Sequence, residues 1–180
     1  MMRKFVVYFH GYGSKANGDK VQRLRAAMPD TETYSFDYDL DPRVSLKALG
    51  DQIDSALLGD LYREPFKMVL VGTSLGAWYA SYFANKYKCK AILINPCYDP
   101  QNMLKKYDLP QDVLDAYSPM DWNVDADYFI SVYDEVIDFS SCLHGVLANG
   151  RTNFFYETDH RFNGEEFNDV ITAVKRHLNA

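Results

Sequence analysis

The sequence alternates between short runs of β-branched or aromatic residues and longer segments whose apolar residues recur at helical spacing. This alternation indicates βαβ units and a parallel sheet, because parallel neighbours need a long crossover connection between them. The runs 68–71 and 91–94 are uninterruptedly apolar, as in strands that are covered on both faces, so their strands should be central. We predict six strands, at residues 4–9, 33–36, 67–72, 90–95, 128–133 and 152–157.

The helical patterns lie between these strands, at residues 21–28, 46–57, 75–82 and 167–178. Each has one apolar face that a sheet would bury. We therefore predict an α/β fold of three layers, with about six mostly parallel strands, helices on both faces and no large cap domain. The 180 residues fit one domain, 1–180. Residues 96–127 form the longest irregular stretch, carry four of the seven prolines, and could form a small lid segment.

Composition and charge exclude several classes of protein. The net charge is −6 without a long Lys/Arg cluster, which argues against binding nucleic acid through a basic face. The cysteines Cys89, Cys97 and Cys142 lack the spacing of a disulfide framework or a zinc site. The apolar run 5–9 is too short for a signal peptide, and no run approaches the ~20 residues of a membrane span. We expect a soluble, cytoplasmic protein without a metal.

The segment Gly72-Thr73-Ser74-Leu75-Gly76 joins the third predicted strand to a predicted helix and matches the pattern G-x-S-x-G. At a strand-to-helix turn, the glycines permit a tight elbow that exposes the serine hydroxyl. Ser74 is therefore the candidate nucleophile. The alternative is an ordinary turn in which the serine caps the helix.

A serine hydroxyl needs a base that accepts its proton. His160 follows the last predicted strand, where the chain order Ser–Asp/Glu–His of an α/β hydrolase places this base. His144 and His177 lie in helical patterns, and a structural role is expected for His10.

The acid that orients the base should lie between Ser74 and His160, directly after a strand. Asp134 follows the fifth predicted strand, and Glu135 is its nearest rival. Asp138 is expected to cap a following helix, and Asp159 is too close to His160 in sequence to reach back to the imidazole.

The loop His10-Gly11-Tyr12-Gly13-Ser14 follows the first predicted strand. Its Tyr12 N–H, with the N–H of Leu75, would form an oxyanion hole. A rival reading treats Gly11, Gly13 and Ala16 as a dinucleotide fingerprint, with Asp37 or Asp39 as the ribose-binding acid. Against this reading, residues 17–19 interrupt the helix that should open at the fingerprint.

With these residues the chain resembles the YqiA/YcfP-like esterases of the α/β-hydrolase superfamily, which have no separate cap domain. The resemblance spans nearly the whole length and lies in residues 8–14, 71–80, 94–96, 134–138 and 159–162. It implies Ser74 as nucleophile, Asp134 as acid and His160 as base, with esterase or thioesterase activity toward simple acyl substrates.

We therefore expect a carboxylic ester hydrolase that cleaves small acyl esters or thioesters through an acyl-enzyme intermediate and needs no cofactor. Its partner would be a small-molecule substrate. A non-catalytic binding module with the same fold is the alternative, because a fold does not fix a function. The residues expected to shape the substrate pocket are Gly11, Asn95, Pro96, Tyr98 and Phe162.

Overall fold

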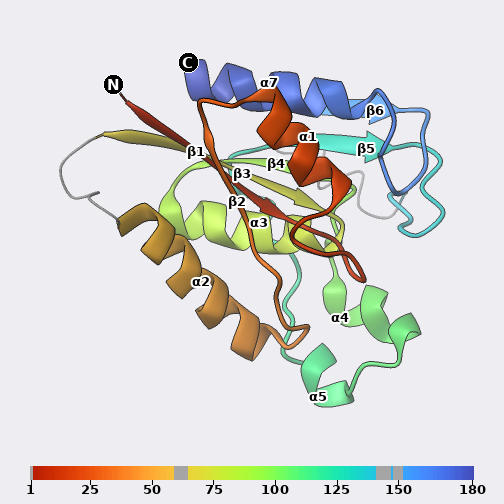
Figure 1. Cartoon of the computed structure of the whole chain (residues 1–180). Coiled ribbons are helices and arrows are strands. Elements are labelled where there is room, and N and C mark those ends of the chain that lie inside the picture. Colours follow the sequence, from red (N-terminus) through yellow and green to blue (C-terminus); the bar gives the residue numbers. More distant parts are fainter. Residues whose placement is uncertain (1, 59–64, 141–146, 148–151) are drawn as a thin grey trace.

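The computed structural model describes residues 2–58, 65–140, 147 and 152–180. In this part of the chain, six strands form one sheet in the order β2-β1-β3-β4-β5-β6, and every neighbouring pair is parallel (Figure 1). The strands are β1 Arg3–Phe9, β2 Glu32–Ser35, β3 Phe66–Thr73, β4 Lys90–Ile94, β5 Ala126–Ser131 and β6 Asn153–Tyr156. Each predicted strand is present within two residues of its expected bounds, and β3 and β4 are central as predicted.

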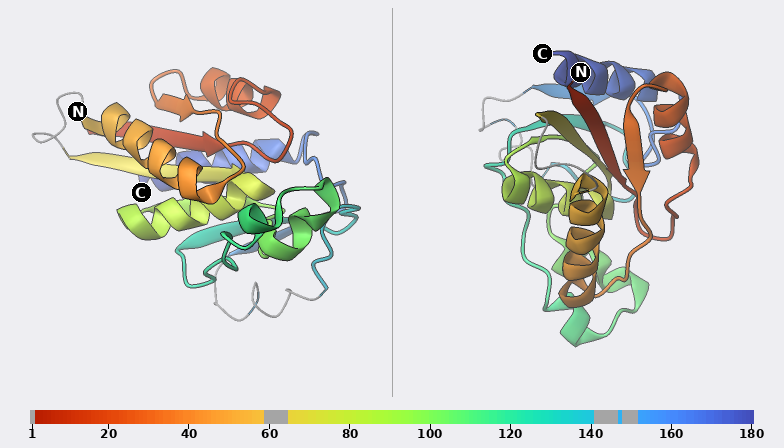
Figure 2. Two further views of the ribbon diagram at one scale, coloured as in Figure 1. Left: turned by 90° about the horizontal axis from the view of Figure 1, so that it is seen from below. Right: turned by 60° about the vertical axis from the view of Figure 1, so that its left-hand side comes forward.

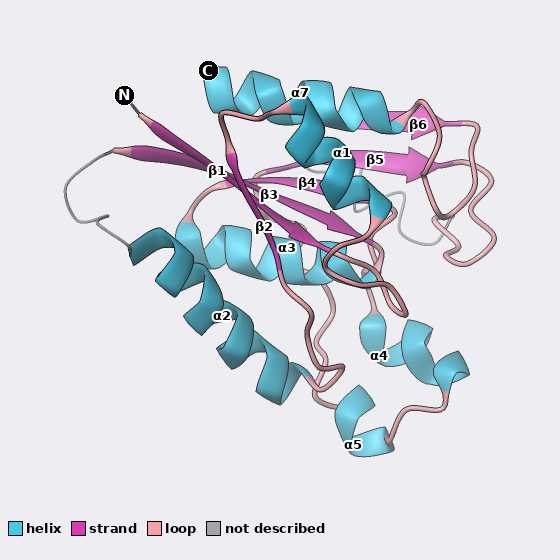
Figure 3. Cartoon of the chain, in the orientation of Figure 1, coloured by secondary structure: helices cyan, strands magenta, loops and turns pink. Residues whose placement is uncertain are grey.

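The longer helices cover both faces of the sheet, which confirms the predicted three-layer α/β architecture. Figures 1 and 3 show α1 and α7 on one face and α2 and α3 on the other, and Figure 2 shows the same layers from two further directions. The helices are α1 Asp19–Ala27, α2 Pro42–Leu58, α3 Leu75–Tyr87, α4 Pro100–Met103, α5 Gln111–Leu114 and α7 Phe167–Asn179, with a 3₁₀ helix, η1, at Leu104–Tyr107.

The sheet divides the core into two apolar layers. Along β3, Met68 and Leu70 pack with α2 and α3, whereas Val69 and Val71 pack with α1 and α7. Successive side chains of a strand point to opposite faces, so a strand covered on both sides must be apolar throughout. This two-sided burial explains why the runs 68–71 and 91–94 are apolar throughout.

Most of the segment 96–127 connects β4 to β5 and contains α4, η1 and α5, while its last two residues belong to β5. Leu104, Leu114 and Tyr117 are buried against the core beside α3, and the Tyr117 hydroxyl donates a 2.6 Å hydrogen bond to the carbonyl of Leu40. The segment is thus packed onto the domain. That it acts as a lid stays a prediction.

None of the helices that the structure describes is both long enough and apolar enough to cross a membrane.

A buried carboxylate, Asp127, lies on β5 at the edge of the sheet opposite to the carboxyl ends of the strands. Only 1% of its side chain is exposed, and it accepts contacts from Lys90 at 2.9 Å, Arg176 at 2.8 Å and His177 at 2.7 Å. Burial by itself raises the pKa of Asp127, but the hydrogen bonds from His177 and Lys90 outweigh burial and hold this pKa below its usual value. This cluster joins β4, β5 and the last turn of α7.

We expect Asp127→Asn to lower the free energy of unfolding by about 2 kcal/mol near pH 7, because charge-assisted hydrogen bonds are lost. A lowered pKa stabilises the fold above the ordinary carboxyl pKa of about 4, and this stabilisation is lost as the pH falls through the folded-state pKa. Urea unfolding at several pH values should therefore show the two proteins converging in acid. Asp125→Asn, an exposed neighbour that also contacts Lys90, is the control. Equal stability of Asp127→Asn and wild type near pH 7 would contradict this assignment.

Candidate active site

Ser74 forms a sharp elbow between β3 and α3. Its backbone has φ 56° and ψ −121°, a conformation that side-chain-bearing residues rarely adopt. The Ser74 N–H donates to the carbonyl of Ile94 at 2.9 Å, and the Ser74 carbonyl accepts from the N–H groups of Ala77 and Cys97, both at 3.0 Å. These bonds hold the elbow against β4 and the chain that follows it.

Two glycines let the elbow close. A Cβ atom on Gly72 would overlap the backbone of Gly76 and Ala77, and a Cβ atom on Gly76 would overlap the carbonyl oxygens of Phe9 and His10. The first turn of α3 can therefore approach β1 and β3 only because both positions are glycine. This explains the glycines of the G-x-S-x-G pattern by close packing.

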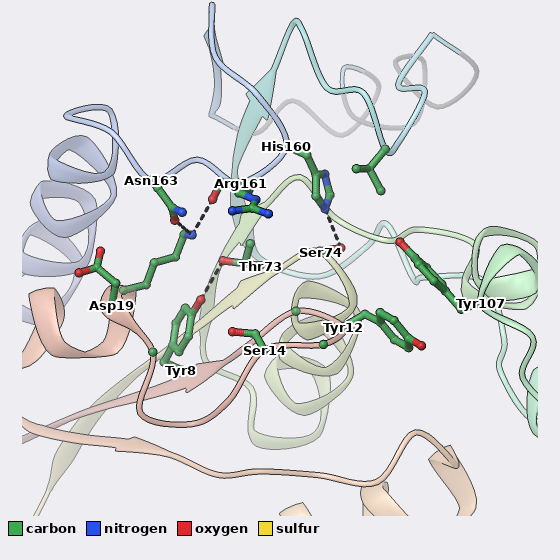
Figure 4. Close-up of a pocket in the computed structure, with 15 residues that line it drawn as sticks. Tyr8, Tyr12, Ser14, Asp19, Thr73, Ser74, Tyr107, His160, Arg161 and Asn163 are labelled. Carbon is green, nitrogen blue, oxygen red and sulfur yellow. Dashed lines mark hydrogen bonds between the residues drawn. The ribbon is translucent and has the colours of Figure 1, made fainter.

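The elbow brings Ser74 into a line of hydrogen bonds with His160 and Asp134, although 86 residues separate the serine from the histidine. His160 Nε2 lies 3.0 Å from Ser74 Oγ, and His160 Nδ1 lies 2.7 Å from Asp134 Oδ2. Figure 4 shows the dashed contact between Ser74 and His160. The Asp134 side chain is 2% exposed and that of His160 14%, and Ser74 is partly exposed, so the line runs from the interior toward the surface.

Backbone groups fix both partners of the serine. Asp134 Oδ1 accepts 2.8 Å hydrogen bonds from the N–H groups of Val136 and Ile137, which leaves Oδ2 for the imidazole. The carboxylate of Glu135 accepts a 3.0 Å hydrogen bond from the backbone N–H of His160. This bond is the main reason why the pKa of Glu135 lies below its usual value. Asp134 thus contacts the ring of His160, and Glu135 contacts its backbone.

The other acidic candidates, Asp159 and Asp138, accept hydrogen bonds from backbone N–H groups within their own turns. Asp159 Oδ1 accepts from the N–H groups of Arg161 and Phe162, and Asp138 Oδ1 accepts from that of Ser140. Both follow the local side-chain-to-backbone pattern that aspartate favours in turns. The helix that Asp138 was expected to cap lies largely outside the described residues.

The remaining histidines lie away from the Ser74 hydroxyl or outside the described residues. His10 is buried, its Nδ1 lies 2.9 Å from the carbonyl of Gly11, and its ring stacks on Tyr38 at a centroid distance of 4.5 Å. His177 contacts Asp127 at the far edge of the sheet. His144 lies outside the described residues.

The glycine loop after β1 closes beside the elbow. The Ser14 N–H donates to the carbonyl of Gly11 at 3.2 Å, and Gly13 has φ 70°. A Cβ atom built on Gly11 would lie 3.3 Å from the Cβ of Ser74, so only a glycine leaves this approach uncrowded. The loop therefore brings Tyr12 next to the first turn of α3, whose leading N–H groups, starting with that of Leu75, have no partner within the helix.

The geometry of the same loop disfavours a dinucleotide site. Helix α1 begins at Asp19, beyond Ala16, so no helix N-terminus opens at the glycines. The carboxylate of Asp37 accepts a 2.7 Å hydrogen bond from the Ala16 N–H and lies 3.4 Å from His10 Nε2. Asp37 thus stabilises the loop itself.

A cavity of about 520 Å³ opens at this point, within the size range of small-molecule sites. Its lining includes Gly11, Tyr12, Ser74 and His160 among the predicted site residues. In Figure 4, Asp19, Asn163 and Arg161 lie on one side of Ser74, and Tyr12 and Tyr107 lie on the other. The cavity therefore has a polar wall and an aromatic wall.

Four predicted pocket residues do not line this cavity. Asn95 and Phe162 are 0% exposed, so their assignment to the substrate pocket is wrong. Phe162 instead packs against Phe129 and Tyr156. Pro96 is buried, and the hydroxyl of Tyr98 donates to the carbonyl of Asp138.

Asn95 holds the loop that carries His160 in place. Its amide nitrogen donates to Ser131 Oγ at 2.7 Å and to the carbonyl of His160 at 3.0 Å, and its amide oxygen accepts from the Ser131 N–H at 2.7 Å. Ser131 Oγ in turn donates to the carbonyl of Asp159 at 2.7 Å. Asn95 therefore ties the end of β4 to β5 and to the loop that carries His160.

Several lining residues are not expected from the sequence, among them Tyr107, Lys20 and Val136. Val136 is a close neighbour of Asp134, so adjacency in sequence could have identified it. Arg161 belongs to the segment 159–162 that carries the family resemblance, and it does line the cavity. Tyr107 comes from an irregular stretch with no periodic pattern, and nothing in the sequence marks it.

In the described ranges, no three His, Cys, Asp or Glu side chains gather as a metal site would require.

We expect Asn95→Asp to lower the free energy of unfolding by about 2–3 kcal/mol, since a carboxylate cannot donate the two amide hydrogen bonds and would be buried with a charge. Urea denaturation is the measurement. Asn17→Asp, which keeps the acceptor that faces Arg25 on the surface, is the matched control and should change stability little. An Asn95→Asp protein as stable as its control would refute the role given to this amide.

Solved structures with the same architecture belong to α/β hydrolases. A protein from Xanthomonas campestris assigned to the alpha/beta hydrolase superfamily superposes with a TM-score of 0.69 at 20% identity, covering 98% of this chain and 99% of that one. An esterase from Pyrococcus furiosus gives a TM-score of 0.75 at 13% identity, covering 99% and 82%. A hyperthermophilic esterase from Pyrobaculum calidifontis gives 0.68 at 18% identity, covering 97% and 77%. The chain therefore has the α/β-hydrolase fold.

Sequence comparison gives the family. A UPF0227 protein from Shewanella loihica is 28% identical over 116 residues, which is 63% of this chain and 62% of that protein. One from Shewanella woodyi is 29% identical over 113 residues, 61% of each. The chain thus spans somewhat less than two thirds of the length of these relatives. The model of the uncharacterised protein family UPF0227 matches residues 5–134, and the chain belongs to this family.

Proposed function

We propose that this protein is a serine hydrolase that cleaves small acyl esters or thioesters, with Ser74, His160 and Asp134 as its catalytic triad. The observation that carries the proposal is the line of two hydrogen bonds, 3.0 Å and 2.7 Å long, that ends on a serine at a strained elbow. A base within hydrogen-bond reach of a nucleophile, itself oriented by a buried carboxylate, is the arrangement that acyl transfer requires.

In the first half-reaction, His160 Nε2 takes the proton of Ser74 as Oγ attacks the carbonyl carbon. Asp134 holds the imidazole through Nδ1 and stabilises its positive charge. The N–H groups of Tyr12 and Leu75 would bind the negative oxygen that develops; removal of a comparable donor in other hydrolases costs about 3 kcal/mol. The imidazolium then returns its proton to the leaving alcohol or thiol, and the acyl group remains on Ser74.

In the second half-reaction, a water molecule takes the position of the departed group. His160 accepts a proton from this water as it attacks the acyl-enzyme. The collapsing intermediate releases a carboxylic acid, and His160 returns the proton to Ser74. The residues of the proposal thus complete the cycle without a metal or an organic cofactor.

The alternative, a binding module without catalysis, is less well supported. A residue other than glycine at positive φ costs about 1–3 kcal/mol, and such strain is concentrated at functional sites. A structural serine would gain nothing from this conformation, because Ser74 makes no side-chain cap to α3. The two thermophile proteins with the same fold are named as esterases, which agrees with the enzyme reading. A small-molecule substrate and a cytoplasmic location remain parts of this proposal.

We expect a fluorophosphonate probe to label the wild-type protein and not Ser74→Ala, because only an activated serine attacks the phosphorus. Ser55→Ala, an exposed serine of α2, should be labelled as the wild type is. In-gel fluorescence after reaction near pH 7 is the measurement. Equal labelling of wild type and Ser74→Ala would remove Ser74 from the mechanism.

The neighbouring carboxylates Asp134 and Glu135 should differ strongly in their effects. Asp134→Asn should lower kcat for a 4-nitrophenyl ester by about 10⁴-fold, the loss that follows the same change in another serine hydrolase, because the amide stabilises the wrong imidazole tautomer. Glu135→Gln should lower kcat less than about tenfold, since the Gln oxygen still accepts the backbone N–H of His160. Steady-state kinetics compare the two variants. Similar losses in both would mean that Asp134 is not the orienting acid.

A further inference from the structure

The residue directly after the proposed base, Arg161, lines the active-site cavity with its long cationic side chain. Figure 4 shows Arg161 between His160 and Asn163 in the lining that also includes Thr73 and Ser74. Nothing in the proposed reaction uses this guanidinium. It nevertheless lines the same cavity as Ser74, where a bound substrate could contact it.

The backbone of Arg161 is held on both sides. His160 is fixed by its contacts to Ser74 and Asp134, and Phe162 is fully buried with φ 51°. The ammonium of Lys20 donates to the carbonyl of Arg161 at 2.5 Å and also to Asn163 Oδ1. Burial lowers the pKa of Lys20 to about 8, against the opposing effect of the adjacent Asp19. These contacts fix the backbone from which the Arg161 side chain extends, next to the proposed base His160.

Lys20, which lines the cavity, and Arg23, which contacts the loop after His160, already have partners. Lys20 is occupied by the loop after His160, and Arg23 donates to the carbonyls of Asn163 and Gly164 at 2.8 and 3.0 Å. In contrast, the guanidinium of Arg161 has no hydrogen bond or ion pair with any residue that the structure describes, although the charge of Glu135 lies near enough to feel it. Arg161 is the cation in this lining that remains available to a ligand.

The opposite wall suits the apolar part of a substrate. The rings of Tyr12 and Tyr107 stack at a centroid distance of 4.1 Å, and Val136 lines the same cavity. Lys106 donates to the carbonyl of Val136 at 3.1 Å, which ties the segment with Tyr107 to the loop after Asp134. Ser74 therefore lies between an aromatic surface and the guanidinium of Arg161, which no described residue contacts by a hydrogen bond or ion pair.

We propose that Arg161 binds a carboxylate of the substrate, so that the esters or thioesters cleaved at Ser74 are those that carry a second, anionic group. This inference rests on the proposed hydrolase function. The planar guanidinium matches a carboxylate with two parallel hydrogen bonds. Asp19 on the same wall and the nearby Glu135 add negative charge, which favours a monoanionic carboxylate over a dianionic phosphate.

The test uses two matched pairs of esters. Mono(4-nitrophenyl) adipate against 4-nitrophenyl hexanoate places the carboxylate on the acyl side. 4-Acetoxybenzoate against phenyl acetate places it on the leaving group. The quantity compared is the ratio of kcat/KM for the anionic ester to that for its neutral partner, so general damage to the enzyme cancels.

We expect Arg161→Gln to lower this ratio about 10- to 100-fold in at least one pair, the effect of a lost charge-assisted hydrogen bond. Arg161→Lys, which keeps the positive charge but lacks the two parallel N–H donors of the guanidinium, should recover part of this ratio. Lys47→Gln removes the same charge from the exposed face of α2 and should leave both ratios at their wild-type values. Unchanged ratios in both pairs with Arg161→Gln would overturn the proposal.

A binding measurement separates this inference from the proposed function. Calorimetric titration of mono(4-nitrophenyl) adipate and of 4-acetoxybenzoate into Ser74→Ala, with and without Arg161→Gln, needs no turnover. Binding that depends on Arg161, in a wild type that hydrolyses none of the four esters, would sink the hydrolase proposal and support the carboxylate site. If the wild type hydrolyses the esters but neither binding nor the kcat/KM ratios depend on Arg161, the hydrolase proposal is supported and the carboxylate site is refuted.

Discussion

The close approach of α3 to the start of the glycine loop is the constraint on which the site depends. Gly76 lets the helix backbone lie against the carbonyls of Phe9 and His10, and Gly72 lets it fold back over the end of β3. Ser74, between these glycines, is forced into a positive φ that lifts its side chain off the sheet. The same packing sets the first turn of α3 beside Tyr12. The proposed nucleophile and the proposed oxyanion donors are therefore positioned by one contact.

The remaining parts meet Ser74 because parallel strands end at the same edge of the sheet. Asp134 follows β5 and His160 follows β6, while Asn95 at the end of β4 holds the loop of the base. None of these residues is near Ser74 in sequence. They come together because of the order of the strands in the sheet. The hydrogen bonds of Asn95 then hold the loop with His160 close enough for His160 to contact Ser74 and Asp134.

Much of this arrangement could be predicted from the sequence. Periodicity identified the strands and the longer helices, and the position of each polar residue after a strand pointed to Ser74, Asp134 and His160, which the fold brings within hydrogen-bond distance. Side-chain environments could not be predicted in this way. Asn95 and Phe162 follow a strand or a base as pocket residues do, yet hydrogen bonding buries one and aromatic packing the other. Tyr107 reaches the cavity only through the packing of an irregular segment, which has no local signature.

In the proposed reaction, Ser74 carries the acyl group during turnover. Peptide mass spectrometry of protein quenched in acid while it hydrolyses 4-nitrophenyl hexanoate tests this most directly. We expect a hexanoyl adduct on the peptide that contains Ser74, absent from Ser74→Ala and strongly diminished in His160→Ala, which lacks the base that activates Ser74 for acylation. Hydrolysis that proceeds with the acyl group on a different residue, or at an undiminished rate in Ser74→Ala, would contradict it.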